Sequence, residues 1–513
     1  MMEQGETGDR DRSVNFPVEW WFYLLFGAVG AVLVWLYTSK YGIGLYPDSI
    51  CYISAARNLA EGKGLLCHTG APLVLWPPLY PSVLALLSLA SISLLPGARV
   101  LHALLLAVIL FCSGEIIRRH CRSRWLLLLA LFVASGAIPL LSASIWLLSE
   151  SLFIVLVLLT ILLIPSCFRR RSMWLLLGVS LLTALACLQR YIGVTLALTI
   201  ATIILAYWPS SSLRKRIALS AGFFIVSCFP LGLYLARNYI LTSTLTGFRV
   251  PSQYTCYQNL NDTLNVISIW FVPAEIPSWI RKILLMLFGG AAGFHILYSI
   301  WKDRKSTIRD AQVPVIVLFT CVYVLTVVVL AGTVSFDRLS DRILSPIYVF
   351  VVFLFIKSAD DLLAYGSQSR HRKAAMSVLF VSLSLYWTGY TVYRVHDKAI
   401  YHCTYGAGGY SHKTWRESDL LRVIQQESIQ GRFFSNAADV LYIFADMSAT
   451  ASPFRAETIE EFREKMSKKE PNYLVWFDVG RKDYIYNLDE IRDIFVLETI
   501  RQCQDGAIYR IMD

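Results

Sequence analysis

The stretch LYPDSICYISAARNLAEGKGL, residues 45–65, follows closely behind the apolar run WWFYLLFGAVGAVLVWLY, residues 20–37, and the two together indicate the class of fold. The apolar run has the length of a transmembrane helix, for which about 20 residues are needed. Behind it stands a lone acid, Asp48, among aromatic residues and a proline. A carboxylate at the end of a spanning segment predicts either a helix cap or a site at the membrane surface.

The composition of the whole chain favours a polytopic α-helical membrane protein. Of its 513 residues 56% are hydrophobic and 16% are charged, whereas about a quarter of the residues in soluble proteins are charged. Windows of about 20 apolar residues predict about eleven spans. These begin near Trp20, Val100, Trp125, Leu152, Met173, Ile192, Ile217, Ile283, Val313, Ile343 and Ala375. The polar N-terminus enters the first span without a signal-peptide cleavage site, so this span is expected to be a retained anchor.

The net charge of +11 comes from short basic segments between the apolar runs, a pattern typical of cytoplasmic loops and not of nucleic-acid binding. The four segments are residues 118–122, 169–171, 213–216 and 301–305. Residues 79–95 either cross the membrane or lie at its surface. Only the second choice, with juxtamembrane helices in place of a span, puts all four basic segments on one face. That topology predicts a cytoplasmic N-terminus.

The predicted topology divides the chain into a membrane module, residues 1–392, and a tail, residues 393–513. The module has two long outer loops, residues 38–99 and 237–281. The tail alternates helix-like stretches with strand-like ones, which predicts a small C-terminal extracytoplasmic α/β domain. The helix-like stretches are ESDLLRVIQQE and ETIEEFREKMSKK, and the strand-like ones are GRFFSN, NYLVWFDV and GAIYRI.

Ionisable residues gather near the ends of the predicted spans on the outer face. They are Asp48, Glu150, Arg190, Arg237, Asp337, Arg338, Asp341 and Arg342. Ionisable side chains at membrane depth cost several kcal/mol unless they are paired or line a wet cavity. Any one of these residues could be a helix cap or a side chain that reaches the interface, but the whole set predicts a site.

The residues behind Asp48 predict an amphipathic helix on the membrane surface. From Ser49 to Ala60 the apolar residues recur at helical spacing and leave Arg57 off the apolar stripe. Asp48 then has two interpretations: an N-cap of this helix, or a general base near arginines that bind a phosphate leaving group. One acid with separate cations suits inverting transfer from a phosphate donor, whereas glycoside hydrolysis needs two acids.

At this point the sequence resembles the membrane glycosyltransferases of the GT-C fold. The run D-x3-Y-x2-A-x6-G-x-G from Asp48, followed by PPLYP at residues 77–81, resembles the first outer loop of these enzymes. The resemblance is strongest to the branch that holds the protein O-mannosyltransferases and the lipid A aminoarabinose transferase. Further matches are SESLF at 149–153, LQRYIG at 188–193, ARNYILTSTLTGFR at 236–249, FDRLSDRILSPIY at 336–348, GGYSHKTWRESDLL at 408–421 and FFSNAADVLYIF at 433–444.

This resemblance implies a transferase in a bacterial or archaeal plasma membrane, or its equivalent. It would move a sugar, with inversion, from a polyprenyl or dolichyl phosphate to a hydroxyl acceptor on the outer face. Asp48 would be the general base, and Glu150 would orient the acceptor or a basic neighbour. The donor phosphate would lie near Arg190, Arg237 and Arg342. The substrate groove would include Tyr52, Arg57, Tyr80 and Tyr239, although tyrosines also suit interfacial anchors.

The sequence also departs from these relatives. Ser49 follows Asp48 where both relatives carry an adjacent Asp-Glu pair, and the large outer domain of the protein O-mannosyltransferases is missing. The acceptor therefore stays open between lipid, glycan and protein, and the sugar stays open as well. We expect no cofactor, because the lipid-linked sugar is a substrate, and no catalytic metal. His68 is expected to be a solvated loop histidine.

Two further points stay open at this level. A polytopic lipid or glycan transporter is the alternative function, although the chain lacks the repeated halves that are common in transporters. Five cysteines are predicted on the outer side, where a disulfide can form, but their spacing assigns no pair. They are Cys51, Cys67, Cys256, Cys403 and Cys503.

Overall fold

Two compact units make up the protein. The computed structural model describes residues 20–209, 212–302, 311–335, 337–366, 370–427, 429–451, 458–466, 470–479 and 485–512. The helical unit consists of Met1–Trp35, Leu101–Ser144 and Ser149–Lys398. The mixed unit consists of Leu36–Val100, Ile145–Leu148 and Ala399–Asp513. The division predicted between residues 392 and 393 falls inside a helix that ends at Tyr405.

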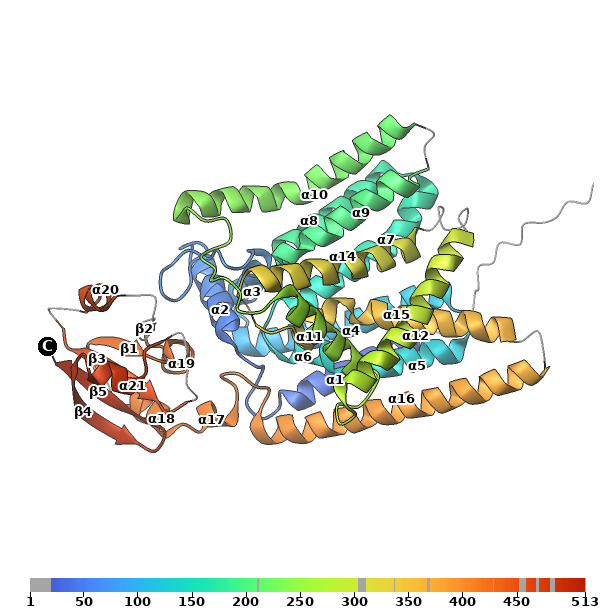
Figure 1. Ribbon diagram of the computed structural model, residues 1–513. Helices are drawn as coiled ribbons and strands as arrows, with labels where there is room; N and C mark the ends of the chain where they lie inside the picture. Colours follow the sequence, from blue (N-terminus) through green and yellow to red (C-terminus); the bar gives the residue numbers. More distant parts are fainter. Residues whose placement is uncertain are drawn as a thin grey trace, which may run out of the picture. The chain divides into compact units, whose positions relative to one another are not determined.

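Long apolar helices build the helical unit (Figure 1). One end of each of α1, α4, α6 and α16 belongs to the mixed unit. The helices are α1 (Trp21–Tyr37), α4 (Leu94–His120), α5 (Arg124–Ser135), α6 (Ile138–Ile145), α7 (Glu150–Arg170), α8 (Met173–Gln189), the 3-10 turn η1 (Tyr191–Gly193), α9 (Val194–Tyr207), α10 (Leu213–Thr242), α11 (Cys256–Ile269), α12 (Ser278–Lys302), α14 (Gln312–Thr333), α15 (Asp341–Gly366) and α16 (Arg370–Tyr405).

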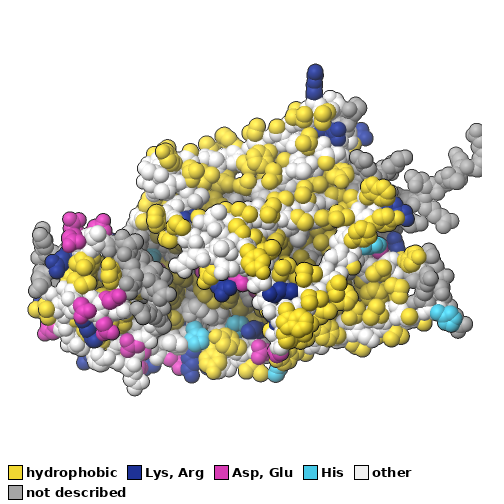
Figure 2. Space-filling model, viewed as in Figure 1, with side chains coloured by type: hydrophobic (Ala, Val, Ile, Leu, Met, Phe, Trp, Pro, Cys, Tyr) yellow, Lys and Arg dark blue, Asp and Glu magenta, His cyan; other side chains and the backbone are white. Residues whose placement is uncertain are grey.

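The chain is a multi-pass membrane protein. Within the described residues, seven helices are long and apolar enough to cross a bilayer, and α5 with α6 makes an eighth as a pair bent by 42°. Helices α1, α8 and α9 are apolar but shorter. All eleven segments predicted as spans are thus helical, while the count of eleven crossings stays a prediction. Hydrophobic side chains are spread over much of the visible face of the helical unit, as contact with lipid requires (Figure 2).

The basic loops gather at one end of the helical unit. Arg119, at the end of α4, donates to the carbonyl of Leu162 at 3.0 Å. The backbone N–H groups of Arg122 and Ser123 donate to the Asp360 carboxylate at 2.9 and 2.8 Å. Arg342 and Asp360 lie on the same helix, and the part of the helix between them is about 27 Å long at 1.5 Å per residue. Arg342 is therefore separated from the basic end by about the thickness of a hydrocarbon core. Of the fourth predicted basic segment, residues 303–305 lie outside the described residues.

The tail folds as the predicted α/β domain. Its sheet has the strand order β2-β1-β3-β5-β4, in which β1 pairs in parallel with β2 and β3, and β5 pairs antiparallel with β3 and β4. Phe434, Phe462 and Leu474 centre its core. The elements are β1 (Arg432–Ser435), β2 (Ala449–Ala451), β3 (Asn472–Phe477), β4 (Val496–Cys503), β5 (Gly506–Met512), α17 (Lys413–Arg416), α18 (Asp419–Gln426), α19 (Ala438–Ala445), α20 (Ile459–Glu464) and α21 (Leu488–Arg492).

Helix α2 (Pro47–Ala60) lies in the mixed unit and is buried more completely than its sequence predicts. Every residue from Ser49 to Ala56 is buried, so the expected helix with a single apolar stripe on the membrane surface is wrong. Helix α3 (Leu79–Leu89) packs against it. Small residues along α2 allow this close approach on several faces. At 11 residues, α3 is about 16 Å long and too short to cross a bilayer, which agrees with a non-spanning segment here.

Asp48 is the second residue of α2 and is not its N-cap, so the capping interpretation is wrong as well. Tyr46 holds the N-cap position, and its backbone N–H donates to the Ser49 hydroxyl at 3.0 Å. Pro47 at the first helical position fixes φ without losing a hydrogen bond. The Asp48 side chain is part-exposed in the first turn, where a carboxylate is favoured by the helix dipole.

The residues before α2 are held by the tail. The carbonyl of Leu45 accepts from the backbone N–H of Tyr410 at 2.7 Å, and the carbonyl of Ile43 accepts from the Ser411 hydroxyl at 2.7 Å. Gly409 has φ +58, and a Cβ there would stand 1.9 Å from the Leu45 oxygen, so only glycine allows this approach. The first-loop motif and the GGYS motif of the tail therefore form one local structure that positions Asp48.

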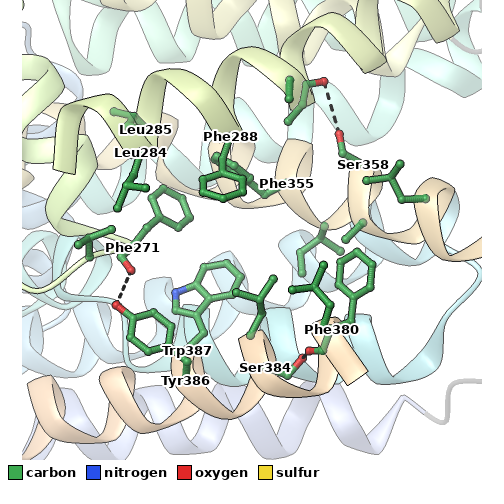
Figure 3. Close-up of a pocket in the computed structure, with 18 of the residues that line it drawn as sticks. Phe271, Leu284, Leu285, Phe288, Phe355, Ser358, Phe380, Ser384, Tyr386 and Trp387 are labelled. Carbon is green, nitrogen blue, oxygen red and sulfur yellow. Dashed lines mark hydrogen bonds between the residues drawn. The ribbon is translucent and has the colours of Figure 1, made fainter. Parts of the chain in front are cut away.

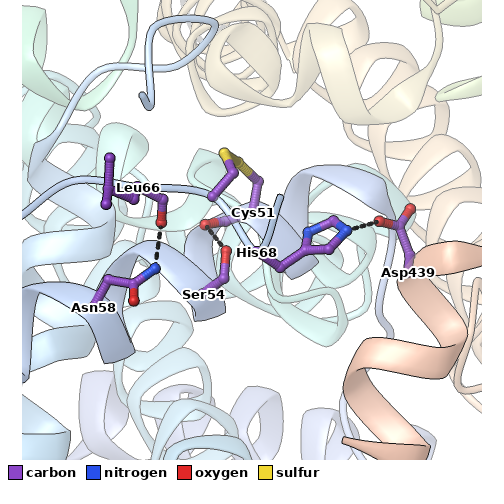
Figure 4. The surroundings of a disulfide bond; sticks show 7 residues. Cys51, Ser54, Asn58, Leu66, His68 and Asp439 are labelled. Carbon is purple, nitrogen blue, oxygen red and sulfur yellow. Dashed lines mark hydrogen bonds and ion pairs between the residues drawn. A yellow bond between two sulfur atoms is a disulfide. The ribbon is translucent and has the colours of Figure 1, made fainter. Parts of the chain in front are cut away.

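A disulfide joins α2 to the loop behind it. Cys51 and Cys67, two of the five predicted outer cysteines, are bonded across a Cα–Cα distance of 4.9 Å (Figure 4). Replacing both by serine is expected to lower the free energy of unfolding by about 3 kcal/mol, because the unfolded chain loses a cross-link that closes a loop of about 16 residues. Thermal unfolding of the full chain measures this effect. Cys503→Ser, which removes an unbonded cysteine, is the control, and an equal shift in both would contradict the prediction.

Candidate active site

Glu150 is the buried centre of an ion cluster in the helical unit. Its side chain is 1% exposed, and its Oε1 accepts from Arg190 Nη1 at 2.7 Å and from Arg342 Nε at 2.8 Å. Arg342 Nη1 also contacts Asp337 at 3.1 Å. Glu150 is the first residue of α7, where the helix dipole favours a carboxylate, and charge-assisted hydrogen bonds offset its burial. Its second oxygen, Oε2, is buried and accepts no hydrogen bond from any residue that the structure describes.

A break between two helices positions Arg190. Helix α8 ends at Gln189, Arg190 is extended with φ −149 and ψ 138, and η1 follows. Gly193 makes this tight turn possible, because a Cβ there would stand 2.4 Å from the carbonyl of Ala186. Arg190 and Gln189 donate to the hydroxyl and the carbonyl of Ser149 at 3.0 and 2.8 Å. These bonds hold the end of α8 against the start of α7.

The second predicted outer loop positions Arg342. Its helix α11 is attached to the start of α15, because Trp270 Nε1 donates to Asp341 at 2.7 Å. Arg338 forms an ion pair of 2.8 Å with Asp262 from the same helix. Both contacts flank Arg342 in the sequence, so the loop and the ion cluster form a continuous polar end of the helical unit.

Arg237 and Tyr239 lie on α10. Arg237 donates to the side chain of Asn238 at 2.9 Å, and Asn238 donates to the Tyr191 hydroxyl at 3.3 Å. Tyr191 is the residue after Arg190, so Arg237 is connected to the cluster through two intermediate side chains. Tyr239 is 60% exposed. The structure thus brings Glu150, Arg190 and Arg342 into direct contact. Arg237 is connected to them through the side chains of Asn238 and Tyr191.

The other predicted site residues belong to the mixed unit. Tyr52 and Tyr80 are buried and meet edge to face, with ring centroids 5.1 Å apart, so they lie in the packed interface between α2 and α3. Arg57 donates to the Tyr442 hydroxyl at 3.4 Å and lies over the same ring. Asp48 stands at the start of the same helix. The role of these residues in a substrate groove stays a prediction.

His68 is not the solvated loop histidine that its sequence suggests. Its side chain is 10% exposed, and its Nε2 lies 3.5 Å from Asp439 Oδ1 (Figure 4). Burial lowers the pKa of His68, and the nearby Asp439 carboxylate partly opposes this shift. Sequence reasoning missed Asp439, although it lies in the stretch FFSNAADVLYIF, because no spacing relates it to a residue of the first loop.

An apolar cavity of about 470 Å³ lies within the helical unit. Side chains of α12, α15 and α16 line it together with Phe271, and aromatic rings point into it from several sides (Figure 3). Ser268 and Val272, which flank Trp270 in the sequence, line the cavity. Trp270 donates a hydrogen bond to Asp341, the residue before Arg342. A mostly apolar cavity with few polar groups suits a hydrocarbon chain.

Metal ligation finds no support in the described part of the chain. No three His, Cys, Asp or Glu side chains gather there as ligands would. Metal-independent and cofactor-independent chemistry stays a prediction.

Solved structures share this fold across almost the whole chain. The structure of ArnT from Cupriavidus metallidurans in the apo state has 10% sequence identity and a TM-score of 0.61, over 95% of this chain and 97% of that chain. ArnT bound to undecaprenyl phosphate has 11% identity and a TM-score of 0.59, over 96% and 98%. The Archaeoglobus fulgidus oligosaccharyltransferase tethered with an acceptor peptide has 11% identity and a TM-score of 0.52, over 90% and 69%.

These likenesses confirm the GT-C-like fold that the sequence resemblance predicts. At identities of 10 and 11% they establish the fold alone. No protein-family model matches the chain. No curated protein matches it in sequence.

Proposed function

We propose that the protein is an integral membrane glycosyltransferase. It transfers a sugar from a polyprenyl phosphate to a hydroxyl acceptor on the outer face of the membrane, with inversion at the sugar and with Asp48 as the general base. The leaving group is the lipid phosphate, which departs as an anion and needs no proton. Water-poor surroundings strengthen each electrostatic contact to that anion.

The observation that carries this proposal is the cluster of Glu150, Arg190 and Arg342. Both guanidinium groups share one buried carboxylate at the end of their helices, and both remain partly exposed, at 22 and 14%. Guanidinium groups match the geometry of phosphate oxygens. Glu150 would hold the two arginines in place for this contact. The cluster lies at the end of α15 away from the basic loops, and basic loops mark the cytoplasmic side, so we place the cluster on the outer face.

The fold and the apolar cavity support the lipid-linked donor. A protein of the same fold binds undecaprenyl phosphate. We assign the cavity beside Phe271 and Trp387 to the prenyl chain and the arginine cluster to the phosphate. Arg237, which is connected to the cluster through Asn238 and Tyr191, and the exposed Tyr239 would border the phosphate site. Neither ArnT nor the oligosaccharyltransferase is a transporter, so the transporter alternative gains no support from these structures.

Arg342→Lys tests the proposal. The ammonium group of a lysine cannot contact the carboxylates of Glu150 and Asp337 together, as the guanidinium group of Arg342 does. We therefore expect transfer activity and undecaprenyl-phosphate affinity to fall at least about tenfold. The assay follows sugar transfer from synthetic polyprenyl-phosphate mannose, glucose, arabinose and aminoarabinose into native membranes that contain the full chain. Arg338→Lys, whose side chain is exposed and paired with Asp262, is the matched control and should stay within about twofold. A wild-type protein that neither transfers any of these sugars nor binds undecaprenyl phosphate would overturn the proposal.

A further inference from the structure

A second polar cluster surrounds His68 in the mixed unit. Asp439 contacts His68 Nε2 through Oδ1 at 3.5 Å and accepts from the Tyr410 hydroxyl through Oδ2 at 2.8 Å. The ring of Tyr442 lies against the imidazole with centroids 5.0 Å apart. Arg57 contacts the hydroxyl of Tyr442. These residues come from α2, the loop behind it, the GGYS segment and α19, so the cluster is built from four separate parts of the chain.

One nitrogen of this cluster makes no hydrogen bond within the described part of the chain. His68 Nδ1 is buried and makes no hydrogen bond with any described residue. Buried polar atoms are nearly always hydrogen-bonded, and an exception calls for a ligand or a water molecule. Since Asp439 attracts the proton to Nε2, Nδ1 keeps its lone pair and acts as a hydrogen-bond acceptor. The lowered pKa of His68 agrees with a neutral imidazole.

The disulfide attaches the loop that carries this nitrogen to the helix that carries Asp48. Cys67, the neighbour of His68, is bonded to Cys51, and Cys51 follows Asp48 by three residues on α2. Residues three apart on a helix lie on the same face, about 5–6 Å apart at Cβ. The loop that carries His68 is therefore attached to α2 about one turn after the proposed base.

We propose that His68 is an acceptor-binding residue, whose Nδ1 accepts a hydrogen bond from a hydroxyl group of the sugar acceptor. This inference rests on the proposed transferase function and deepens it. It implies an acceptor with at least two hydroxyl groups, one that Asp48 deprotonates and one that His68 binds. Asp439, with Tyr410, is a positioning residue that holds the imidazole in the required tautomer.

Two isosteric changes separate this role from a structural one. In His68→Asn the side-chain amide lies at the δ position and replaces Nδ1, but it cannot reach Asp439. In His68→Gln the amide lies at the ε position, keeps the contact with Asp439 and leaves the Nδ1 position empty. Each variant of the full chain is expressed in cells that lack the native gene, and the sugar added to surface products is measured by mass spectrometry. Undecaprenyl-phosphate binding to the purified chain serves as the control for folding and for the donor site.

The expected result is that His68→Asn keeps transfer within about threefold of wild type, whereas His68→Gln loses at least about tenfold, which is the effect of one unsatisfied buried hydrogen bond. Undecaprenyl-phosphate binding should be unchanged in both. The reverse order would assign His68 a purely structural role through Asp439 and overturn the inference. Equal activities in the two variants, whether high or low, would overturn it too. If wild type shows no transfer and no lipid binding, the proposed function itself fails, which is a different result from a failure confined to the His68 variants.

Discussion

Replacing Glu150 by alanine is expected to lower the free energy of unfolding by about 3–5 kcal/mol, the typical result of removing one partner from a buried ion pair. The change removes the carboxylate that Arg190 and Arg342 share at distances of 2.7 and 2.8 Å. The two guanidinium groups would then face each other across a buried site with like charge. The ion pairs that join Arg190 and Arg342 to the start of α7 would be lost, and donor binding would be lost with them.

Glu115→Ala is the matched control for this prediction. Glu115 also receives two arginines, Arg118 at 2.8 Å and Arg119 at 2.9 Å, but its side chain is 20% exposed and all three residues lie on α4. Solvent screens such a pair, so the expected loss is about 1 kcal/mol or less. Thermal unfolding of both variants in the same detergent measures the difference. Equal shifts would mean that burial of Glu150 adds nothing and that the cluster does not hold the helices together.

Much of the fold follows from the sequence because apolar runs determine the helices of a membrane protein. Each predicted span is helical, and the strands β1, β3 and β5 appear where alternating or continuous apolar residues predict them. Strands β2 and β4 carry no such signal. The first has three residues at one edge of the sheet, and the second, VLETIRQC, is exposed along most of its length, so neither shows a buried face to detect.

The candidate site is predictable only in part. Glu150, Arg190 and Arg342 stand out in the sequence because charged residues are rare at the ends of spans. Their pairing depends on the break at Gly193 and on the packing of α11, which no local pattern reveals. His68 and Asp439 are far apart in the sequence, and no local pattern relates them. The burial of α2 was missed because its small residues, Ser54, Ala55 and Ala56, look weakly apolar although they permit the closest packing.

Asp48→Asn is expected to lower the transfer rate by about 10²–10⁴-fold, the usual contribution of a general base. Asparagine has the same shape and can still accept a hydrogen bond, but it cannot take the proton of the acceptor hydroxyl. Since Asp48 is part-exposed in the first turn of α2 and Pro47 and Tyr46 define the start of that helix, folding should be unaffected. Undecaprenyl-phosphate binding should also persist, because the arginines that we assign to the phosphate are unchanged.

Glu61→Gln provides the comparison at the other end of the same helix. Glu61 is exposed and paired with Lys63 at 2.6 Å, so the loss of its charge should leave transfer within about twofold. Sugar transfer from the active polyprenyl-phosphate donor, measured at saturating lipid, then isolates the chemical step in all three proteins. An Asp48→Asn protein that keeps more than about a tenth of the wild-type rate would exclude this carboxylate as the base. The proton would then have to pass to another group, and the imidazole of His68, whose loop the disulfide attaches to the same helix, would be the first to test.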